Sequence, residues 1–490
     1  MATTDYASIE VIRQLQAIVG DDYVVYKPED LIVYEYDGSA DKAMPSIVVV
    51  PEDAEQVSAV VKVARENEVP IVPRGAGTGL SGGAVAQVGG IVISLTRMTR
   101  ILEVDVENRI AVVEPGVINL HLTEYVSQYG LCYAPDPSSQ KACTIGGNVA
   151  ENSGGPHCLA YGVTTNHVLG MEVVMADGSL QWVGGRTRET PGYDLRGILI
   201  GSEGTLAIVT KVIVRLLRQP EAVKTLLAVF RDVSEASAAV SGIIGAGIVP
   251  AAIEMMDALC IQAVEPAVNA GYPEDAGAVL LVEVEGLHES VEEEVEEIEN
   301  VCNEFGPIEI RTATSQEARD RLWAGRKGVL GALGRLAPNY LLVDGTVPRT
   351  KLVEVLSQIR QLSQDSGYPI ANLLHAGDGN LHPSVLFDER KPGDTDKALA
   401  LGGEILRMCV DAGGVLTGEH GIGLEKQEYM DFMFTDDDME AMARLKPAFD
   451  TRDMLNPAKI FPTGASCGEV AGHHSHWHGA IARVGADAWI

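Results

Sequence analysis

The chain has 490 residues, of which 69 are Asp or Glu and 37 are Lys or Arg, so its formal net charge is −32. We do not expect such an acidic chain to bind nucleic acid or an anionic membrane surface, because both require clustered cations. The composition, 46% hydrophobic and 22% charged, is typical of a globular protein of several domains and excludes a disordered chain, collagen and a small disulfide scaffold.

The N-terminal sequence MATTDYASIEVIRQLQAIVG contains no basic segment followed by an apolar core, so we expect no secretory signal and a cytoplasmic location. Seven Cys residues show neither regular spacing nor a C-x-x-C motif, which favours unpaired thiols in a reducing compartment. The chain therefore offers no iron–sulfur or structural zinc motif of its own.

The first part of the chain is predicted to contain an N-terminal helical segment over 1–40 and an α+β ligand-binding domain over 41–219. Apolar spacing over 8–20 indicates an amphipathic helix. From Ile47 the sequence predicts a buried strand, IVVVP, a helix with apolar positions at 57, 60, 61 and 64, and a second strand, PIVPRG. Glycine clusters separated by short strands follow, which indicates backbone loops that approach a ligand.

One stretch, residues 236–253, has no charged residue over 18 positions and so has the length of a membrane span. It contains Ser237, Ser241, three Gly and Pro250, and much of its apolar content is Ala, so its insertion would be weak. We therefore expect no transmembrane segment here. The sequence favours a helix that Ser234 caps and Gly247 ends, followed by a strand.

Residues 220–460 are predicted to form a second α+β domain around an antiparallel sheet, because strands such as LLVEVEG and YLLVDGTVP alternate with helices. The acidic run SVEEEVEEIENVC is interpreted as a solvated helix, since Val291, Val295, Ile298 and Cys302 fall on one stripe. The tail over 461–490 contains four closely spaced His. Metal binding, contact with a partner subunit and an unstructured end remain open for it.

The strongest local motif is PRGAGTGLSGG, residues 73–83. Its Gly77-x-Gly79-x-x-Gly82 spacing matches the dinucleotide-binding fingerprint, which must open a helix. Only the seven residues AVAQVGG separate Gly83 from the next strand, IVISL, which is too short for that helix. We interpret the motif as a loop whose main-chain N–H groups bind phosphate oxygens without a helix.

Two further glycine clusters, TIGGNVAENSGGPHCLAYG (144–162) and GSEGTLAIVT (201–210), lie in the same predicted domain. A single cluster of this kind is more often a tight turn between strands. Three clusters around one sheet favour an extended ligand that the backbone contacts along its length.

In the second half, LLHAGDGNLHP places His375 and His382 seven positions apart, and GGVLTGEHGIG supplies Glu419 and His420. Imidazole and carboxylate groups are ligands for divalent cations such as Zn, Mn or Fe, and three protein ligands leave positions open for substrate. A lone His is more often a structural residue, but two His around a glycine turn favour a metal site.

The motifs PRGAGTGLSGG, PDPSS, TIGGNVAENSGG and GSEGTLAIVT resemble the FAD-binding domain of the vanillyl-alcohol oxidase and p-cresol methylhydroxylase superfamily. The second half resembles the C-terminal domain of FAD-linked D-2-hydroxy-acid dehydrogenases, above all the flavoprotein subunits of glycolate dehydrogenases (glycolate oxidases) and next the D-lactate dehydrogenases. The resemblance, over residues 40–460, implies an α+β fold with an FAD-binding domain of two subdomains and a substrate domain with an antiparallel sheet. The residues that it assigns to FAD are Pro73, Arg74, Gly75, Ala76, Gly77, Thr78, Gly79, Ser81, Gly82, Pro135, Asp136, Pro137, Ser138, Thr144, Gly146, Gly147, Asn148, Asn152, Ser153, Gly154, Gly162, Glu203, Gly204, Thr205, Leu206, Ile208 and Asn456.

The same resemblance assigns the divalent metal to His375, His382 and Glu419, and proton abstraction to His420. Through the pattern Trp323-Ala-Gly-Arg326 it assigns the substrate carboxylate to Arg326. Two alternatives stay open, namely that His420 only orients Glu419 and that Arg326 forms a surface salt bridge. FAD is expected to be noncovalent, because His157, the nearby His, matches no attachment motif.

These assignments imply oxidation of a small D-2-hydroxy acid, such as glycolate or D-lactate, to the 2-oxo acid. The alternatives are a D-2-hydroxyglutarate or other longer D-2-hydroxy-acid dehydrogenase, an alkyl-ether synthase of the same superfamily, and a noncatalytic flavin- or metal-binding scaffold. The electron acceptor is expected to be external, either iron–sulfur subunits or a quinone, a dye-like acceptor or oxygen. A homo-oligomer is left open, as is attachment to a membrane periphery through partner subunits.

Overall fold

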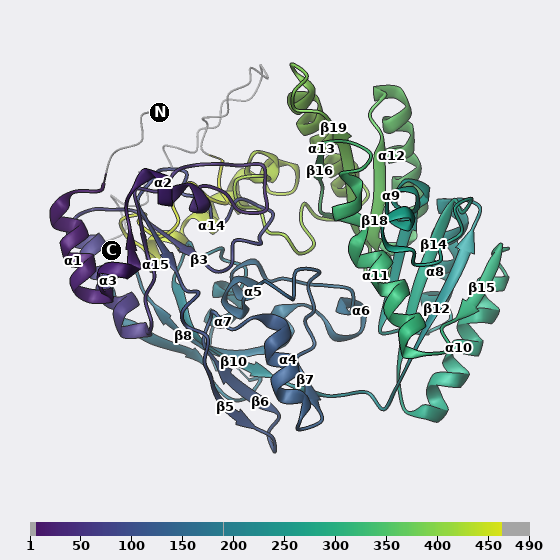
Figure 1. Ribbon diagram of the computed structural model, residues 1–490, viewed down its shortest axis with the longest axis horizontal. Coiled ribbons are helices and arrows are strands. Elements are labelled where there is room, and N and C mark those ends of the chain that lie inside the picture. Colours follow the sequence, from purple (N-terminus) through teal and green to yellow (C-terminus); the bar gives the residue numbers. More distant parts are fainter. Residues whose placement is uncertain (1–5, 190, 463–490) are drawn as a thin grey trace. The chain divides into compact units, whose positions relative to one another are not determined.

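The computed structural model describes residues 6–189 and 191–462 and divides the chain into two compact units (Figure 1). The first unit comprises the chain up to Ser153, the segment Val163–Arg218 and the chain from Glu419 onward. The second unit comprises Gly154–Gly162 and Gln219–Gly418. Most of the His-containing tail lies outside the described residues. The three roles considered for it, metal binding, contact with a partner subunit and an unstructured end, therefore stay predictions.

The first unit begins with a small sheet in the order β1-β2-β4-β3, in which β2, β4 and β3 are parallel and β1 is antiparallel. The connection from β2 to β3 runs through helix α3, as the sequence predicted, and β4 lies between the two strands. The elements of this region are α1 (Ile9–Val19), η1 (Asp21–Tyr23), β1 (Val24–Val25), α2 (Pro28–Leu31), η2 (Ile32–Tyr34), β2 (Ile47–Val49), α3 (Ala54–Glu66), β3 (Ile71–Arg74) and β4 (Ile91–Ser94).

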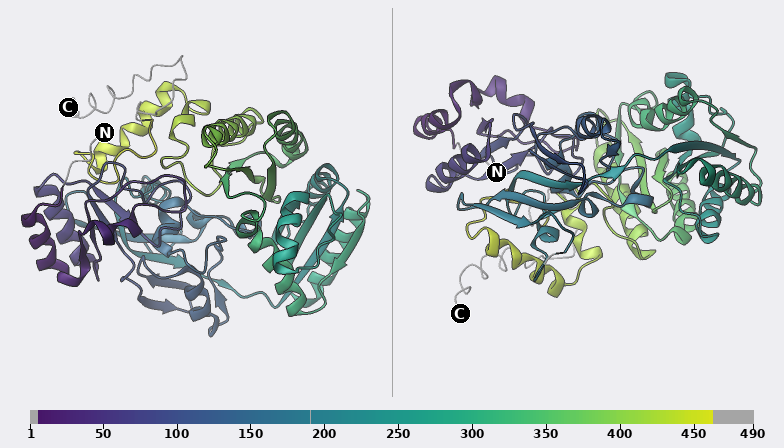
Figure 2. Two further views of the ribbon diagram at one scale, coloured as in Figure 1. Left: turned by 45° about the horizontal axis from the view of Figure 1, so that its top comes forward. Right: turned by 90° about the horizontal axis from the view of Figure 1, so that it is seen from below.

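Helices α1 and α3 lie side by side and are purple in Figures 1 and 2. The side chains of Ser8 and Asp53 accept hydrogen bonds from main-chain N–H groups of the first turns and so cap the two helices. The apolar face of α3, which includes Val57, Val60 and Val61, is fully buried against strands of the small sheet. The amphipathic helices predicted at both places are confirmed.

A second sheet of the first unit is antiparallel throughout, in the order β5-β6-β10-β8-β9. Its core side packs against α4 and α5. The first unit therefore consists of two α+β subdomains, as expected. Its further elements are β5 (Ile101–Asp105), β6 (Ile110–Val113), α4 (Asn119–Ser127), β7 (Leu131–Cys132), α5 (Ile145–Glu151), η3 (Thr164–Asn166), β8 (Val168–Val174), β9 (Leu180–Gly184), α7 (Leu195–Leu199), β10 (Ile208–Arg215), β11 (Leu217–Arg218), η5 (Gln427–Phe432), α14 (Asp436–Ala443) and α15 (Leu445–Phe449).

The second unit is built on one large antiparallel sheet in the order β15-β12-β14-β13-β18-β19-β16, with β17 paired to β19. One face packs against α9 and α11, while α8, α10, α12 and α13 contact the sheet as well (Figure 1). Its elements are α6 (Cys158–Tyr161), β12 (Ala222–Phe230), α8 (Val233–Gly245), β13 (Ala252–Asp257), α9 (Ala258–Val268), β14 (Ala278–Gly286), α10 (His288–Asn303), β15 (Glu309–Thr312), α11 (Gln316–Leu333), β16 (Asn339–Leu342), β17 (Gly345–Thr346), η4 (Arg349–Lys351), α12 (Leu352–Ser366), β18 (Ile370–His375), β19 (Asn380–Phe387) and α13 (Asp394–Asp411).

The uncharged stretch 236–253 forms most of α8, a turn and the start of β13. Asp232 caps α8 through the N–H groups of Ser234 and Glu235, so the expected cap at Ser234 is wrong. Ser234 lies inside the first turn of α8, where its own main-chain N–H needs an acceptor, and Asp232 at the N-cap position supplies that acceptor. Among the described helices, none is both long and apolar enough to cross a membrane. The acidic run forms α10, with the predicted stripe of Val291, Val295, Ile298 and Cys302 buried.

Candidate functional site

The first glycine loop leaves the carboxyl end of β3 and reaches β4 without forming a helix over residues 75–90. This agrees with the prediction that the dinucleotide fingerprint lacks its helix. A Cβ atom added at Gly75 would collide with Oγ1 of Thr144, the residue that caps α5 through the N–H of Gly147. The absence of a side chain at Gly75 therefore allows the first glycine loop to approach the second.

The third glycine cluster joins the same place. Glu203 and Gly204 have φ angles of 53° and 69°, and a Cβ atom at Gly204 would collide with the ring of Pro73. The N–H of Glu203 donates to the carbonyl of Ala150 at 2.8 Å. The Asn456 side-chain amide donates to the carbonyls of Gly83, at 2.9 Å, and Glu203, at 2.7 Å. The structure thus brings together all three glycine clusters and Asn456.

This region offers polar groups that a ligand could satisfy. Nδ2 of Asn148 and Oδ1 of Asn456 are buried and have no hydrogen-bond partner among the described residues. Buried polar atoms in folded proteins nearly always have a partner, so these two atoms are available to a bound ligand or an ordered water. An extended polar cofactor such as FAD fits this set. Asn119 also ties the loop containing Pro135 to α4, since its Nδ2 donates to the Pro135 carbonyl at 2.9 Å.

Most of the residues assigned to FAD lie in the first unit. Gly154 and Gly162 are the exceptions, since they bound the short segment that belongs to the second unit. The FAD residues of the first unit are Pro73, Arg74, Gly75, Ala76, Gly77, Thr78, Gly79, Ser81, Gly82, Pro135, Asp136, Pro137, Ser138, Thr144, Gly146, Gly147, Asn148, Asn152, Ser153, Glu203, Gly204, Thr205, Leu206, Ile208 and Asn456.

The segment that carries His420 is bound to these loops within the first unit. The Glu203 carboxylate accepts the N–H groups of Ile422 and Gly423, each at 2.7 Å. The carbonyl of Ser81, in the first glycine loop, accepts the N–H of Leu424 at 2.7 Å. His420 therefore precedes by two residues a turn that the first and third glycine clusters hold in place.

Sequence analysis assigned Glu203 to the FAD site but missed two other buried ionisable residues of this region, Glu151 and Lys459. Burial raises the pKa of Glu203 to about 6 and lowers that of Lys459 to about 8. Burial, together with the carboxylates of Glu203 and Asp37, raises the pKa of Glu151 well above its usual range. Glu151, the one ionisable residue of the segment TIGGNVAENSGG, was a signal that could have been noticed.

In the second unit, His375 and His382 lie on the adjacent strands β18 and β19, with ring centroids 5.1 Å apart. His382 lies opposite Leu373, two positions before His375, so both imidazoles are on the same face of the sheet. Both side chains are buried. Two neighbouring imidazoles are a suitable pair of ligands for Zn, Mn or Fe, and the structure brings this predicted pair together.

Glu254, on β13, is a residue that sequence analysis missed. It lies directly opposite His375, and its Oε1 is 2.7 Å from Nδ1 of that residue. Its Oε2 forms an ion pair with Nη2 of Arg326 on α11, at 2.5 Å. Burial acts to raise the pKa of Glu254, but the charge of Arg326 and the hydrogen bond with His375 outweigh it and hold this pKa below its usual range. A lone Glu in the apolar strand AAIEMM was the available signal.

Arg326 was predicted to bind a substrate carboxylate, with a surface salt bridge as the alternative. It is only 3% exposed, so its ion pair with Glu254 is buried and the surface alternative is wrong. Nε of Arg326 is buried and has no hydrogen-bond partner in the described part of the chain. A guanidinium with an unused donor is able to bind an additional anion.

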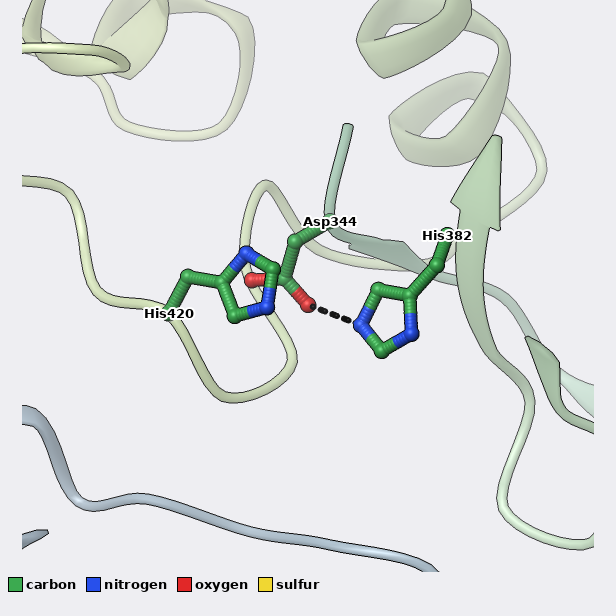
Figure 3. A group of neighbouring side chains, drawn as sticks. All are labelled: Asp344, His382 and His420. Carbon is green, nitrogen blue, oxygen red and sulfur yellow. Dashed lines mark ion pairs between the residues drawn. The ribbon is translucent and has the colours of Figure 1, made fainter. Parts of the chain in front are cut away.

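Asp344 is fully buried beside His382, with Oδ1 3.4 Å from Nε2 of the imidazole (Figure 3). Its Oδ2 accepts hydrogen bonds from Oγ1 of Thr417, at 2.6 Å, and from the N–H of Gly418, at 3.0 Å. These bonds fix the last residue of the second unit, Gly418, which Glu419 follows directly in the chain.

A separate polar cluster surrounds Glu283 on β14. Arg319 binds this carboxylate through two nitrogens, at 3.0 and 2.8 Å, and Trp323 donates to it at 2.5 Å. Nε2 of His157 is 3.1 Å from Oε1 of Glu283. Because Arg319 already neutralises the carboxylate, His157 and Glu283 are better explained as a structural anchor than as metal ligands.

Comparisons with known proteins assign the two parts of the chain to two families. The family described as "FAD binding domain" matches residues 45–184, and the family described as "FAD linked oxidases, C-terminal domain" matches residues 219–460. The class of protein that these domains define is the FAD-dependent oxidoreductases. Within that class, the chain belongs to the FAD-linked oxidases, as its relatives also show.

The chain is 44% identical to the glycolate oxidase subunit GlcD of Escherichia coli K12 over 98% of this chain and 96% of the relative. It is 35% identical to a D-lactate dehydrogenase of Archaeoglobus fulgidus, over 89% of this chain and 96% of that one. A solved structure of p-cresol methylhydroxylase with substrate bound matches the fold with a TM-score of 0.78, at 18% identity over 94% and 98% of the two chains. The expected family and fold are confirmed.

Proposed function

We propose that this protein oxidises a small D-2-hydroxy acid, glycolate or D-lactate, to the 2-oxo acid with noncovalent FAD as the oxidant. The observation that carries the proposal is the attachment of the His420 segment to the glycine loops through Glu203 and Ser81. A proton acceptor placed next to a flavin-binding region suits alcohol oxidation, which must remove one proton and one hydride. The names of its relatives, a glycolate oxidase subunit and D-lactate dehydrogenases, support the substrate class.

In the proposed reaction, His420 takes the hydroxyl proton and Arg326 binds the substrate carboxylate. FAD, when bound, accepts the hydride of the α-carbon, so the alcohol loses two electrons and two hydrogens and becomes a carbonyl. The proposed metal ligands are His375, His382 and Glu419. A divalent cation held by them would make the hydroxyl proton more acidic and thereby ease its transfer to His420.

The electrons are proposed to leave through an external acceptor, with iron–sulfur partner subunits as the specific candidate. The relatives from Escherichia coli and Bacillus subtilis are named as subunits, which supports an assembly of this kind. Co-purification of the untagged chain with its partners, followed by iron analysis, would test this part of the proposal. If the chain purifies without iron-containing partners and its reduced flavin is rapidly reoxidised by oxygen, this part of the proposal is contradicted.

Anaerobic reduction of the purified flavoprotein is the experiment that tests the activity. Glycolate and D-lactate should bleach the flavin absorbance, whereas L-lactate should not. Faster bleaching by D-2-hydroxyglutarate would move the substrate to the longer dicarboxylic acid. If none of these acids bleached the flavin, the protein would instead be the noncatalytic scaffold that the sequence left open.

The roles of His420 and the metal ligands need separate variants. His420→Ala should retain FAD and metal but bleach about a hundredfold more slowly, since a general base contributes about that much. An unchanged bleaching rate would contradict the role of His420 as the base. His382→Ala should lose bound metal while keeping FAD, and equal metal content in the two proteins would contradict the ligand set.

A further inference from the structure

The sheet face that packs against α9 and α11 is apolar except for a row of polar side chains. Glu283 on β14, Glu254 on β13, and His375 and His382 on the next two strands share this face, because opposite residues of neighbouring strands point the same way. All four are buried. Each carboxylate in such a place requires a partner of opposite charge.

Helix α11 supplies one cation to each carboxylate. Arg319 pairs with Glu283 and Arg326 with Glu254. The two Arg residues are seven positions apart, which is about two helical turns, so both cations point at the sheet. The two carboxylates differ in their remaining partners. Glu283 is bonded by Arg319, Trp323, Thr225 and His157, none of which belongs to the proposed metal or substrate site.

Glu254 instead binds two residues of the proposed active site. It meets Arg326 through Oε2 and His375 through Oε1. An ionised carboxylate only accepts hydrogen bonds, so Nδ1 of His375 must be the protonated nitrogen. Nε2 of a neutral His375 then carries the lone pair that a metal ion requires.

We propose that Glu254 is a positioning residue that sets the tautomer of His375 for metal binding and the orientation of Arg326 for the substrate carboxylate. This inference rests on the proposed function, because it concerns the metal ligand and the anion-binding residue named there. The cross-strand register of Glu254 and His375 and the burial of all three side chains leave the carboxylate little freedom to move. One group thus aligns two parts of the site.

Glu254→Gln is the informative substitution, because it keeps the shape of the side chain and removes its charge. A Gln can turn its NH2 group towards Nδ1 of His375, which would favour the tautomer with the proton on Nε2 and block metal binding. Loss of such a partner of a metal-bound His weakens metal affinity by about 10–100-fold. The KM for the hydroxy acid should rise as well, because Arg326 loses the anion that orients it.

Glu283→Gln is the matched control. It removes a buried carboxylate that lies on the same sheet face and pairs with the same helix, α11, so it reproduces the loss of a buried ion pair without touching His375 or Arg326. The full-length FAD-loaded protein should be titrated calorimetrically with Mn²⁺ and with Zn²⁺, after removal of bound metal, and its thermal unfolding followed. The expected result is metal affinity lowered at least about tenfold in Glu254→Gln and nearly unchanged in Glu283→Gln.

The outcomes separate the two proposals. Wild-type protein that binds neither ion would overturn the ligand set and the role of Glu254 with it. If wild type and Glu254→Gln bind the ion with equal affinity, the positioning role alone is overturned. The same holds if Glu254→Gln and Glu283→Gln lose the same amount of metal affinity. If Glu254→Gln does not fold, the double variant Glu254→Gln/Arg326→Gln removes the unpaired cation and allows the same titration. Wild-type affinity in the double variant would also overturn the role.

Discussion

Oε2 of Glu203 accepts a hydrogen bond from the N–H of Gly423 at 2.7 Å, although the two residues are 220 positions apart in the chain. Ile422, the preceding residue, donates to the other oxygen of the same carboxylate. Glu203 belongs to the third glycine cluster, so this contact attaches the segment after His420 to the predicted FAD loops. The Glu203 carboxylate thus serves as the acceptor for two N–H groups of the turn in place of main-chain carbonyls.

Replacing Glu203 tests this attachment. Glu203→Ala leaves two N–H groups without an acceptor, which should lower the free energy of unfolding by about 1–3 kcal/mol. It should also slow the reduction of bound flavin by substrate, because the turn beside His420 is released. Urea unfolding and stopped-flow absorbance measure the two effects. Glu203→Gln keeps one oxygen acceptor, so its unfolding free energy and its rate of flavin reduction should change less. If Glu203→Ala matches wild type in both assays, Glu203 does not hold the turn beside His420.

The close approach of the first two glycine clusters predicts a specific loss of FAD. Gly75→Ala should force the loop away from Thr144, because the new Cβ has no room, and FAD content should fall at least several-fold. Gly185→Ala serves as the control, since a Cβ there meets no heavy atom within 4 Å and the φ angle is not positive. Flavin absorbance per protein measures occupancy. Equal occupancy in the two variants would show that the contact does not shape the FAD site.

Lys459 predicts an alkaline pH dependence of stability. Its pKa falls from 10.5 to about 8 in the folded protein because of burial. Between these pH values the unfolded chain binds a proton that the folded chain does not, so stability rises with pH. The full pKa shift corresponds to a gain of about 3 kcal/mol in the free energy of unfolding. This gain is absent below about pH 8 and complete above about pH 10.5.

Lys459→Met, which keeps the length of the side chain, should lack this rise. Urea unfolding of wild type and variant at several pH values across the window gives the two profiles. The difference in unfolding free energy between the proteins should grow in favour of wild type as pH increases. Parallel profiles would mean that Lys459 keeps an ordinary pKa in the folded protein.

The anchor around Glu283 predicts unequal effects of two Arg substitutions. Arg319→Gln leaves the fully buried carboxylate of Glu283 without its cation and should cost about 3 kcal/mol of unfolding free energy. Arg186→Gln removes an ion pair with Glu103 in which both side chains are about half exposed, so its effect should be much smaller. Chemical denaturation compares them. Similar losses would show that burial does not decide the strength of the pair at Glu283.

Several features could be predicted from local sequence because local physics decides them. The stripe of Val291, Val295 and Ile298 defines α10 whatever lies elsewhere in the chain. The seven residues after Gly83 exclude a helix simply by their number. Other expectations were missed because several acceptors compete within a few residues, as at α8, where Asp232 rather than Ser234 is the cap.

By itself, the sequence determined the α+β class, the family, the glycine loops and the pair of His375 and His382, since each depends on spacing within a short motif. Tertiary structure alone decided that Glu254 meets His375 and Arg326, and that Glu203 meets Gly423. These contacts join residues more than seventy positions apart, for which one sequence contains no distance information. Their physical cause is burial: a carboxylate enclosed by the fold must find the nearest donor or cation, and only the packed strands, loops and helices determine which one that is.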